Sequence, residues 1–180
     1  MSMHRSVALL PAILICALLL PPATTAADDL GQPATQSQIK AWNDDVSPSG
    51  DNLPPGSGSV SQGQHIYAAS CAACHGAQGQ GGPMDRLVGG AGSLNTAKPV
   101  KTVGSYWPHA TTVFDYIRRA MPFTSPGTLT NDQVYAVAGY ILYMNGIVPQ
   151  NAVMNAKSLA ALKMPNQPNF LKKDPRPDAP

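Results

Sequence analysis

The sequence contains no glutamate, so all 10 of its acidic residues are aspartates. Charged residues make up only 12% of the 180 positions, and the formal net charge is +2. A charge this small does not indicate a nucleic-acid-binding surface. A paired-carboxylate acid–base site would have to use aspartate alone, and the two adjacent pairs, at 28–29 and 44–45, lie in loop-like sequence. The composition therefore favours neither a nucleic-acid-binding protein nor a carboxylate-based enzyme.

Long hydrophobic runs are also scarce, and the only prominent one lies near the N-terminus. Two polar residues at 4–5 precede an apolar run over 7–20, which ends at the proline pair 21–22. Small residues follow, so the segment is typical of a secretory signal peptide, with cleavage expected near Ala26 or Ala27. A membrane-spanning helix needs about 20 apolar residues. We therefore expect a periplasmic protein without a stable membrane anchor, and an uncleaved anchor is the alternative.

Cysteine occurs only 3 times, and Cys16 lies inside the signal peptide. The mature chain keeps Cys71 and Cys74 in the stretch AASCAACHG, where His75 follows at once. A structural zinc site usually takes four ligands, and the sequence has no second cysteine pair. A redox C-x-x-C motif normally accompanies a βαβ pattern, which is lacking. Covalent attachment of one haem c uses both thiols and the histidine, so it is the interpretation we favour over the other two.

The sequence pattern divides the chain into four parts. After the signal peptide at 1–27, residues 28–58 are rich in Pro, Gly and Ser without a sustained hydrophobic period, so we expect an extended arm. Residues 59–146 form the domain that carries the Cys-x-x-Cys-His motif. Residues 147–180 form a C-terminal extension with one or two helical turns at 158–163.

Three helices are predicted in the domain, and no strand pattern of any length is found. The first runs from Ser59 to Cys71 and the second from about His109 to Ala120. The third follows a capping box formed by Thr130 and Gln133, and it ends at Gly146. We expect an all-α fold with long loops. Because so small a domain often needs a cofactor for stability, a haem would supply the missing core.

A second axial ligand for the haem iron has to come from elsewhere in the chain. The candidate side chains are those of Met84, His109, Met121, Met144, Met154 and Met164. Met121 stands at the end of the second predicted helix, where Pro122 stops the helix and can turn the preceding side chain inward. Met164 also precedes a proline, so it is the main alternative.

The domain resembles class I cytochromes c over residues 59–146. The resemblance rests on Gly63, Tyr67 and Cys71 in the first helix, on Gly139-Tyr140 in the last, on Gly82-Pro83, and on Ala120-Met121-Pro122-Phe123. It implies the class I cytochrome c fold, with three main helices and long loops around one haem. It also implies that Met121 is the sixth ligand and that the Gly82-Pro83 carbonyl accepts the N–H of His75.

Histidine–methionine ligation closes both faces of the iron, so it favours electron transfer over oxygen or peroxide chemistry. The buried haem propionates would need hydrogen-bonding or charged partners. The candidates are Tyr106, Trp107, Arg86, Arg118 and Arg119, and one of the last two is expected to be a solvated surface residue.

A closer resemblance lies in the run TVGSYWPHATTVFDYIRRAMPF together with KMPNQPNF, over roughly 101–170. These segments are similar to the cytochrome subunits of bacterial sulfite dehydrogenase and sulfane dehydrogenase. The resemblance implies a subunit that accepts electrons from a molybdenum-cofactor subunit and passes them to another cytochrome c. The chain has a single Cys-x-x-Cys-His motif, unlike the two-haem sulfane dehydrogenase cytochrome. A free soluble cytochrome c and a haem enzyme that oxidises thiosulfate itself remain the alternatives.

Overall fold

The structure is a computed structural model, and it describes residues 31–171. The signal peptide expected at 1–27 lies outside the described residues. The chain divides into two compact units, Met1–Trp42 and Asn43–Pro180. Among the described residues, no helix has the length and apolar character needed to cross a membrane.

The described part of the first unit contains the short helix α2, Gln36–Trp42. The prediction of an extended arm over 28–58 is wrong here, because a capping box stabilises this helix. Gln38 N–H donates to the Thr35 hydroxyl at 3.3 Å, and the Gln38 side chain accepts from Thr35 N–H at 2.8 Å. None of the residues of α2 is buried, and Trp42 is 85% exposed.

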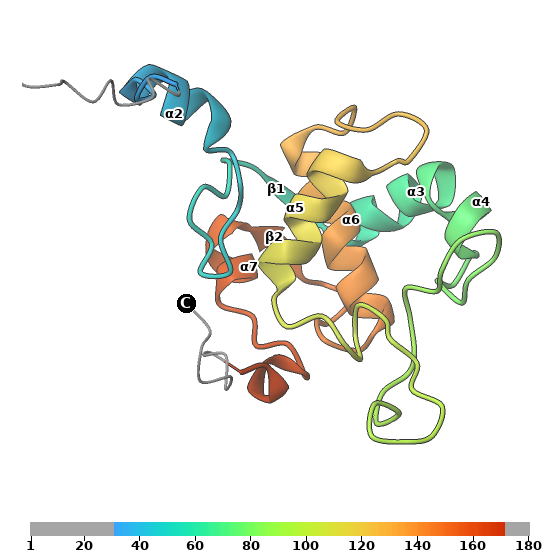
Figure 1. Ribbon diagram of the computed structural model, residues 1–180. Helices are drawn as coiled ribbons and strands as arrows, with labels where there is room; N and C mark the ends of the chain where they lie inside the picture. Colours follow the sequence, from blue (N-terminus) through green and yellow to red (C-terminus); the bar gives the residue numbers. More distant parts are fainter. Residues whose placement is uncertain (1–30, 172–180) are drawn as a thin grey trace, which may run out of the picture. The chain divides into compact units, whose positions relative to one another are not determined.

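The second unit consists mainly of helices joined by long loops (Figure 1). Its elements in chain order are β1 Ser57–Ser59, α3 Val60–Ser70, α4 Ala72–His75, α5 Ala110–Ala120, α6 Asn131–Met144, β2 Val153–Asn155, α7 Ala156–Ala160 and the 3₁₀ turn η1 Gln167–Asn169. The predicted helices correspond to α3, α5 and α6, and the expected all-α class I cytochrome c fold is confirmed. The predicted N-cap Ser59 and the capping box at Thr130 and Gln133 are both present.

Helices α3 and α6 cross at Gly63, where the two backbones come very close. A Cβ atom added at Gly63 would lie 1.9 Å from the Ala136 carbonyl oxygen. One turn further along each helix, the rings of Tyr67 and Tyr140 lie with their centroids 5.4 Å apart. The crossing therefore requires glycine at position 63, and it holds the end of α3 firmly against α6.

The two short strands form an antiparallel pair in which Gly58 lies opposite Met154. The prediction that the chain contains no strand is therefore wrong for the described residues. Three residues in each strand are too few to show the alternation of polar and apolar residues by which strands are recognised. The pair connects the start of α3 to the segment before α7.

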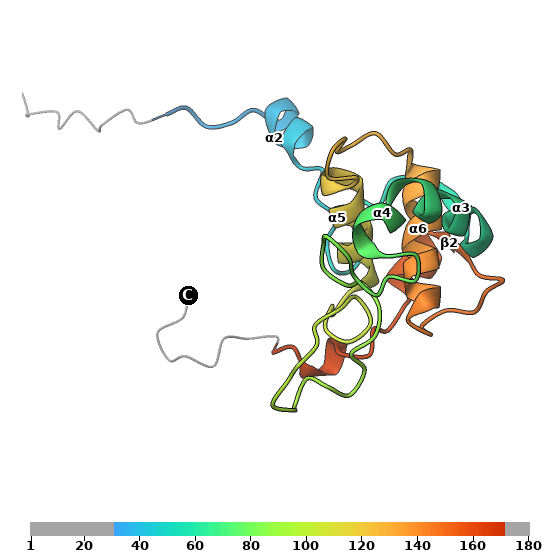
Figure 2. The same cartoon turned by 90° about the vertical axis from the view of Figure 1, so that its right-hand side faces the viewer.

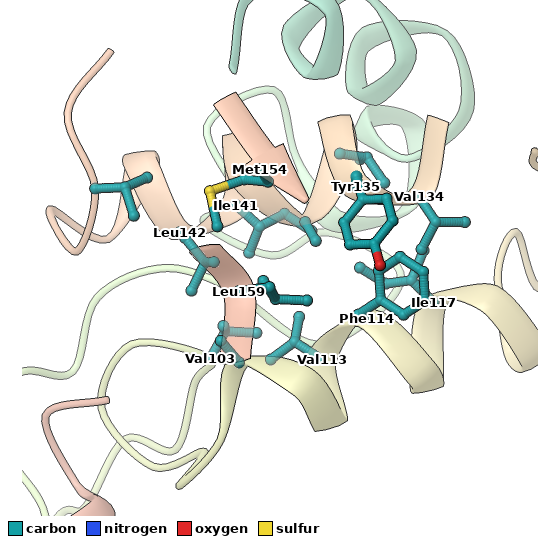
Figure 3. Packing of buried hydrophobic residues seen from close by; sticks show 14 of the residues in the cluster. Val103, Val113, Phe114, Ile117, Val134, Tyr135, Ile141, Leu142, Met154 and Leu159 are labelled. Carbon is teal, nitrogen blue, oxygen red and sulfur yellow. The ribbon is translucent and has the colours of Figure 1, made fainter. Parts of the chain in front are cut away.

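The core lies between α5, α6 and the C-terminal segment (Figure 3). Phe114 of α5 and Tyr135 of α6 are fully buried, with ring centroids 4.4 Å apart. Met154, Leu159 and Met164 are each at most 2% exposed. The segment after α6 therefore contributes its apolar side chains to this core.

Residues 43–58 also belong to the second unit, although the sequence suggested that they form part of an arm. Val46 is buried in the core, the Thr111 hydroxyl donates to the Pro48 carbonyl at 3.1 Å, and the Tyr135 hydroxyl donates to the Pro54 carbonyl at 2.8 Å. We call residues 43–56 the N-terminal strap. Its contacts come from α5 and α6, which local sequence patterns do not reveal.

Candidate functional site

Cys71, Cys74 and His75 lie on a single turn where α3 ends and α4 begins. Cys71 caps both helices. Its N–H donates to the Tyr67 carbonyl at 2.9 Å, and its carbonyl accepts from His75 N–H at 3.0 Å. Cys71 is partly buried and Cys74 is exposed, and they form no disulfide. This turn brings both thiols and the imidazole to the same end of α3.

The environment of Cys71 is unsuited to redox-dithiol chemistry. Burial, and then the neighbouring Cys74, raise the pKa of the Cys71 thiol to about 11. A catalytic Cys-x-x-C motif needs the opposite shift, because the thiolate is the reactive form. Residues 31–171 contain no group of three or more His, Cys, Asp or Glu side chains that could hold a metal ion by themselves. The motif therefore lacks the ligands of a structural zinc site within this part of the chain.

The imidazole of His75 is oriented by a backbone carbonyl. Its Nδ1 atom lies 2.7 Å from the Asp85 carbonyl oxygen. A carbonyl can only accept, so Nδ1 carries the proton and Nε2 has a free lone pair for a metal. Ligating histidines in proteins are commonly oriented by such a contact.

The carbonyl acceptor differs from the Gly82-Pro83 carbonyl that the family resemblance implied. Gly82 N–H donates to the Met84 carbonyl at 3.0 Å, and Met84 N–H donates to the Cys74 carbonyl at 3.0 Å. This tight turn leaves Pro83 exposed and brings Asp85 to His75 instead. A role of Pro83 against the haem remains a prediction.

Tyr67 fixes the chain just after the histidine. Its hydroxyl donates to the Gly76 carbonyl at 2.9 Å. Burial, more than the nearby Cys71, raises the pKa of Tyr67 to about 12, so the phenol keeps its proton for this bond. Gly76 has φ +82°, a conformation that glycine adopts without strain.

Asn145 is a further residue that holds the site together, and sequence analysis did not identify it. From the C-terminal end of α6, its amide donates to the Leu87 carbonyl at 3.1 Å and its side-chain oxygen accepts from Gly89 N–H at 3.3 Å. The segment that follows Asp85 is thereby bound to α6. The contacts join residues 58 and 56 positions apart, so no local pattern indicates them.

Met121 caps the C-terminal end of α5, and its N–H donates to the Ile117 carbonyl at 3.1 Å. Its side chain is partly buried against the core, and the loop to α6 begins directly after it. The loop leads from this end of α5 to the start of α6 (Figure 1, Figure 2). The role of Met121 as the ligand opposite His75 stays a prediction.

The other candidate ligands are placed less favourably. Met164 is 2% exposed and is packed within the hydrophobic core. Met84 is hydrogen-bonded through its backbone to Cys74, so it belongs to the same loop as His75. His109 precedes α5, at the end of that helix opposite to Met121. Met121 stays the predicted sixth ligand.

Two predicted propionate donors lie in the segment before α5. Trp107 is partly buried, and its ring packs edge-on against Tyr116 with the centroids 5.7 Å apart. Tyr106 is 37% exposed and packs edge-on against Phe170 at 5.6 Å. Their roles toward a haem stay predictions, as does that of Arg86, which is exposed.

Arg118, in contrast, is paired with carboxylates rather than available to a propionate. Its guanidinium lies 3.2 Å from Asp115 and 3.7 Å from Asp44, and it also donates to the Asp44 carbonyl. Arg119 likewise pairs with Asp115 and Asp45. These pairs engage the guanidinium of Arg118 in this structure, and the role of Arg118 toward a propionate stays a prediction. Asp115 was not recognised in the sequence because a lone aspartate on a helix usually faces solvent.

The arrangement fits a covalently bound haem. Two thiols lie at the required spacing on one turn, and the adjacent imidazole presents Nε2 because the Asp85 carbonyl occupies Nδ1. The thioether of Met121 stands at the C-terminal end of a different helix, α5. Iron in a haem accepts this pair of axial ligands.

Comparisons with known proteins agree with this interpretation. Residues 58–141 match the family model described as cytochrome C oxidase, cbb3-type, subunit III. Among solved structures, the chain is similar to one chain of the sulfane dehydrogenase SoxCD from Paracoccus pantotrophus, with a TM-score of 0.73 and 42% sequence identity. The match covers 81% of this chain and 72% of that chain. A comparison with curated protein sequences gives no match.

Proposed function

Because the chain belongs to the cytochrome c family and carries a covalently bound haem c, we propose that it is the electron-transfer subunit of a periplasmic sulfur-compound dehydrogenase. In this role it accepts electrons from a molybdenum-cofactor subunit that oxidises the sulfur compound. It then passes them singly to another cytochrome c.

The observation that carries this proposal is the similarity to a chain of SoxCD. An identity of 42% over 72% of that chain is much more specific than the Cys-x-x-Cys-His motif alone. Because the matched protein is a sulfane dehydrogenase, the comparison favours a sulfane-type substrate over sulfite.

The residues of the site have distinct roles in this proposal. Cys71 and Cys74 attach the haem, His75 binds the iron through Nε2, and Met121 binds it from the other face. A bound haem c supplies a ferric–ferrous couple that takes one electron at a time. With both axial positions held by side chains, the chain excludes substrate from the iron, which suits electron transfer.

Oxidation of the sulfur compound requires a partner, because both mature cysteines are used for haem attachment. Molybdenum subunits of this kind bind their metal through a cysteine, as the family resemblance implies. The described part of this chain has only Cys71 and Cys74. The chain is therefore proposed as the relay and its partner as the site of substrate oxidation.

Reduction of the haem by sulfur compounds tests the proposal. The purified holo-chain is mixed with thiosulfate or with sulfite, with and without a molybdenum-containing fraction, while the absorption of reduced haem is followed. We expect rapid reduction only when that fraction is present. The matched control is the same fraction after removal of its molybdenum cofactor.

Two outcomes would contradict the proposal. Reduction of the isolated chain at catalytic rates would make it a haem enzyme in its own right. Equal reduction by many unrelated donors, without dependence on the molybdenum fraction, would make it a free electron shuttle. The substrate that supports reduction distinguishes the sulfane and sulfite systems.

A further inference from the structure

Five charged residues meet where the N-terminal strap passes over the end of α5. We call this group the charge cluster, and it consists of Asp44, Asp45, Asp115, Arg118 and Arg119. The three carboxylates face two guanidinium groups, so the cluster carries one net negative charge. It joins residues that are 74 positions apart in the sequence.

Asp115 is the centre of the charge cluster. Its Oδ2 atom lies 2.6 Å from Arg119 Nη2, and its Oδ1 atom lies 3.2 Å from Arg118 Nη2. Its side chain is only 9% exposed. Arg118 and Arg119 stand three and four residues after Asp115, so the Asp115 carboxylate forms ion pairs with both arginines in the last turn of α5.

The strap completes the charge cluster from outside the helix. Arg119 Nη1 lies 2.8 Å from the Asp45 carboxylate, and Arg118 contacts both the carboxylate and the backbone carbonyl of Asp44. The Nε atom of Arg118 is buried and has no hydrogen-bond partner among residues 31–171. Because this guanidinium is already incompletely paired, it depends strongly on its remaining carboxylates.

The charge cluster lies next to Met121 in the chain. Arg119 stands two residues before Met121, and the Met121 N–H is bonded to the carbonyl of Ile117 in the same last turn. Beyond it, the hydrogen bonds of the described loop 122–129 are local, from Ser125 N–H to the Pro122 carbonyl and from the Thr128 hydroxyl to the Ser125 carbonyl. Phe123 in this loop is 71% exposed. The loop therefore provides little support for the methionine, and its position depends on the end of α5.

We propose that the charge cluster is a positioning device that holds Met121 on the haem iron, with Asp115 as the central positioning residue. This inference rests on the proposed function only through the assignment of Met121 as axial ligand. The strap thereby becomes part of the haem site, although none of its residues needs to contact the haem. A loosened last turn would let the methionine leave the iron more often.

Substitution of Asp115 by Asn in the full-length holo-protein tests this role. The change keeps the shape of the side chain but removes its charge. We expect the methionine–iron charge-transfer band of the ferric protein to weaken and the affinity of the iron for added imidazole to rise about 10-fold, as for loss of other supporting contacts around metal sites. The reduction potential should fall as methionine ligation weakens.

Two further variants make the result specific. Asp45→Asn removes an exposed member of the charge cluster, so we expect a normal fold and a rise in imidazole affinity of about 2-fold. Asp51→Asn is the matched control, because Asp51 lies on the same strap but its carboxylate, within residues 31–171, bonds only to the hydroxyls of Ser47 and Ser49. It should leave imidazole affinity and the band unchanged.

A merely structural charge cluster would give a different result. In that case Asp115→Asn would lower the melting temperature but leave the band, the potential and imidazole affinity of the folded protein as in the wild type, which would overturn the inference. Met121→Ala separates this from an error in ligand assignment. If the methionine–iron band survives in Met121→Ala, Met121 is not the ligand, and both the ligand assignment and the inference fail. If the band is lost in Met121→Ala but unchanged in Asp115→Asn and Asp45→Asn, only the inference fails. Electron transfer from the molybdenum fraction is measured independently of these spectra.

Discussion

The histidine side and the methionine side of the site are held in different ways. On the histidine side, Tyr67 bonds to Gly76 and His75 bonds to Asp85, across 9 and 10 positions of the sequence. On the methionine side, the end of α5 is held by carboxylates of the strap, 74 positions away from Arg119. The contacts of His75 itself are therefore local, although Asn145 of α6 also binds the segment after Asp85, whereas the end of α5 before Met121 pairs with a distant segment of the chain.

This difference bears on how the reduction potential of such a protein is adjusted. The axial methionine influences the reduction potential, whereas the histidine and the two thioether links secure the haem. Changes in the strap can alter the methionine side without disturbing haem attachment. The histidine side is tied to the crossing of α3 and α6, so changes there should act on the whole fold.

The largest effect is expected from Gly63→Ala, which breaks the support of the histidine side. Its Cβ would lie 1.9 Å from the Ala136 carbonyl oxygen, so α3 would have to move away from α6. We expect a loss of about 3 kcal/mol in the free energy of unfolding, measured by guanidinium denaturation of the holo-protein. Gln64→Ala, at an exposed position of the same helix, is the control. An unchanged denaturation midpoint in Gly63→Ala would mean that the helices do not cross so closely.

The next largest effect is expected from Met164→Ala, which should change stability, whereas Met121→Ala should change the absorption spectrum. Met164 is 2% exposed in the core, so Met164→Ala should lower the free energy of unfolding by about 2 kcal/mol and leave the methionine–iron band intact. Met121→Ala should abolish the band. Absorption spectra and denaturation curves of both variants measure this. The reverse pattern would make Met164 the ligand.

A smaller effect is expected when the hydrogen bond beside the histidine is removed. Tyr67→Phe leaves the Gly76 carbonyl without its donor, so we expect a loss of about 1–2 kcal/mol in the free energy of unfolding. The methionine–iron band should not change, because this bond belongs to the histidine side. Tyr140→Phe is the control, since the Tyr140 hydroxyl makes no hydrogen bond within residues 31–171. Equal losses in both variants would mean that the effect does not come from the bond to Gly76.

The smallest effect compares two matching capping boxes. Ser59 caps α3 on the histidine side, and Thr130 caps α6 at the end of the loop that follows Met121. Replacing either with Ala should lower the free energy of unfolding by about 1 kcal/mol. Neither change should alter imidazole binding to the ferric haem, because the loop provides little support for the methionine, whose position depends on the end of α5. A rise in imidazole affinity in Thr130→Ala alone would mean that the loop also holds Met121.

The helices of the second unit could be predicted because their ends carry strong local signals. Ser59 and Thr130 each form a capping box, and Pro122 follows directly after the end of α5. The same kind of signal exists at Thr35 and Gln38, yet α2 was missed because its surroundings are rich in Pro, Gly and Ser. The strands were missed because three residues show no period.

Tertiary structure was needed for the partners of the site. The Gly82-Pro83 pair suggested the wrong carbonyl for His75, since the turn from Gly82 to Met84 brings Asp85 there. Arg118 was predicted to face a propionate, but Asp44 and Asp115 bind it. Such contacts depend on how helices and loops pack, which short motifs do not encode.

By itself the sequence determined an α-helical domain with a covalently bound haem, and it predicted that Cys71, Cys74 and His75 attach it. The attachment motif can be read locally because it requires three neighbouring residues that local structure brings together. The sequence also placed Met121 at the end of a helix. Only the tertiary structure decided that the N-terminal strap pairs with Arg118 and Arg119 beside that methionine. The physical reason is that an ion pair between residues 74 positions apart forms only when the chain has packed.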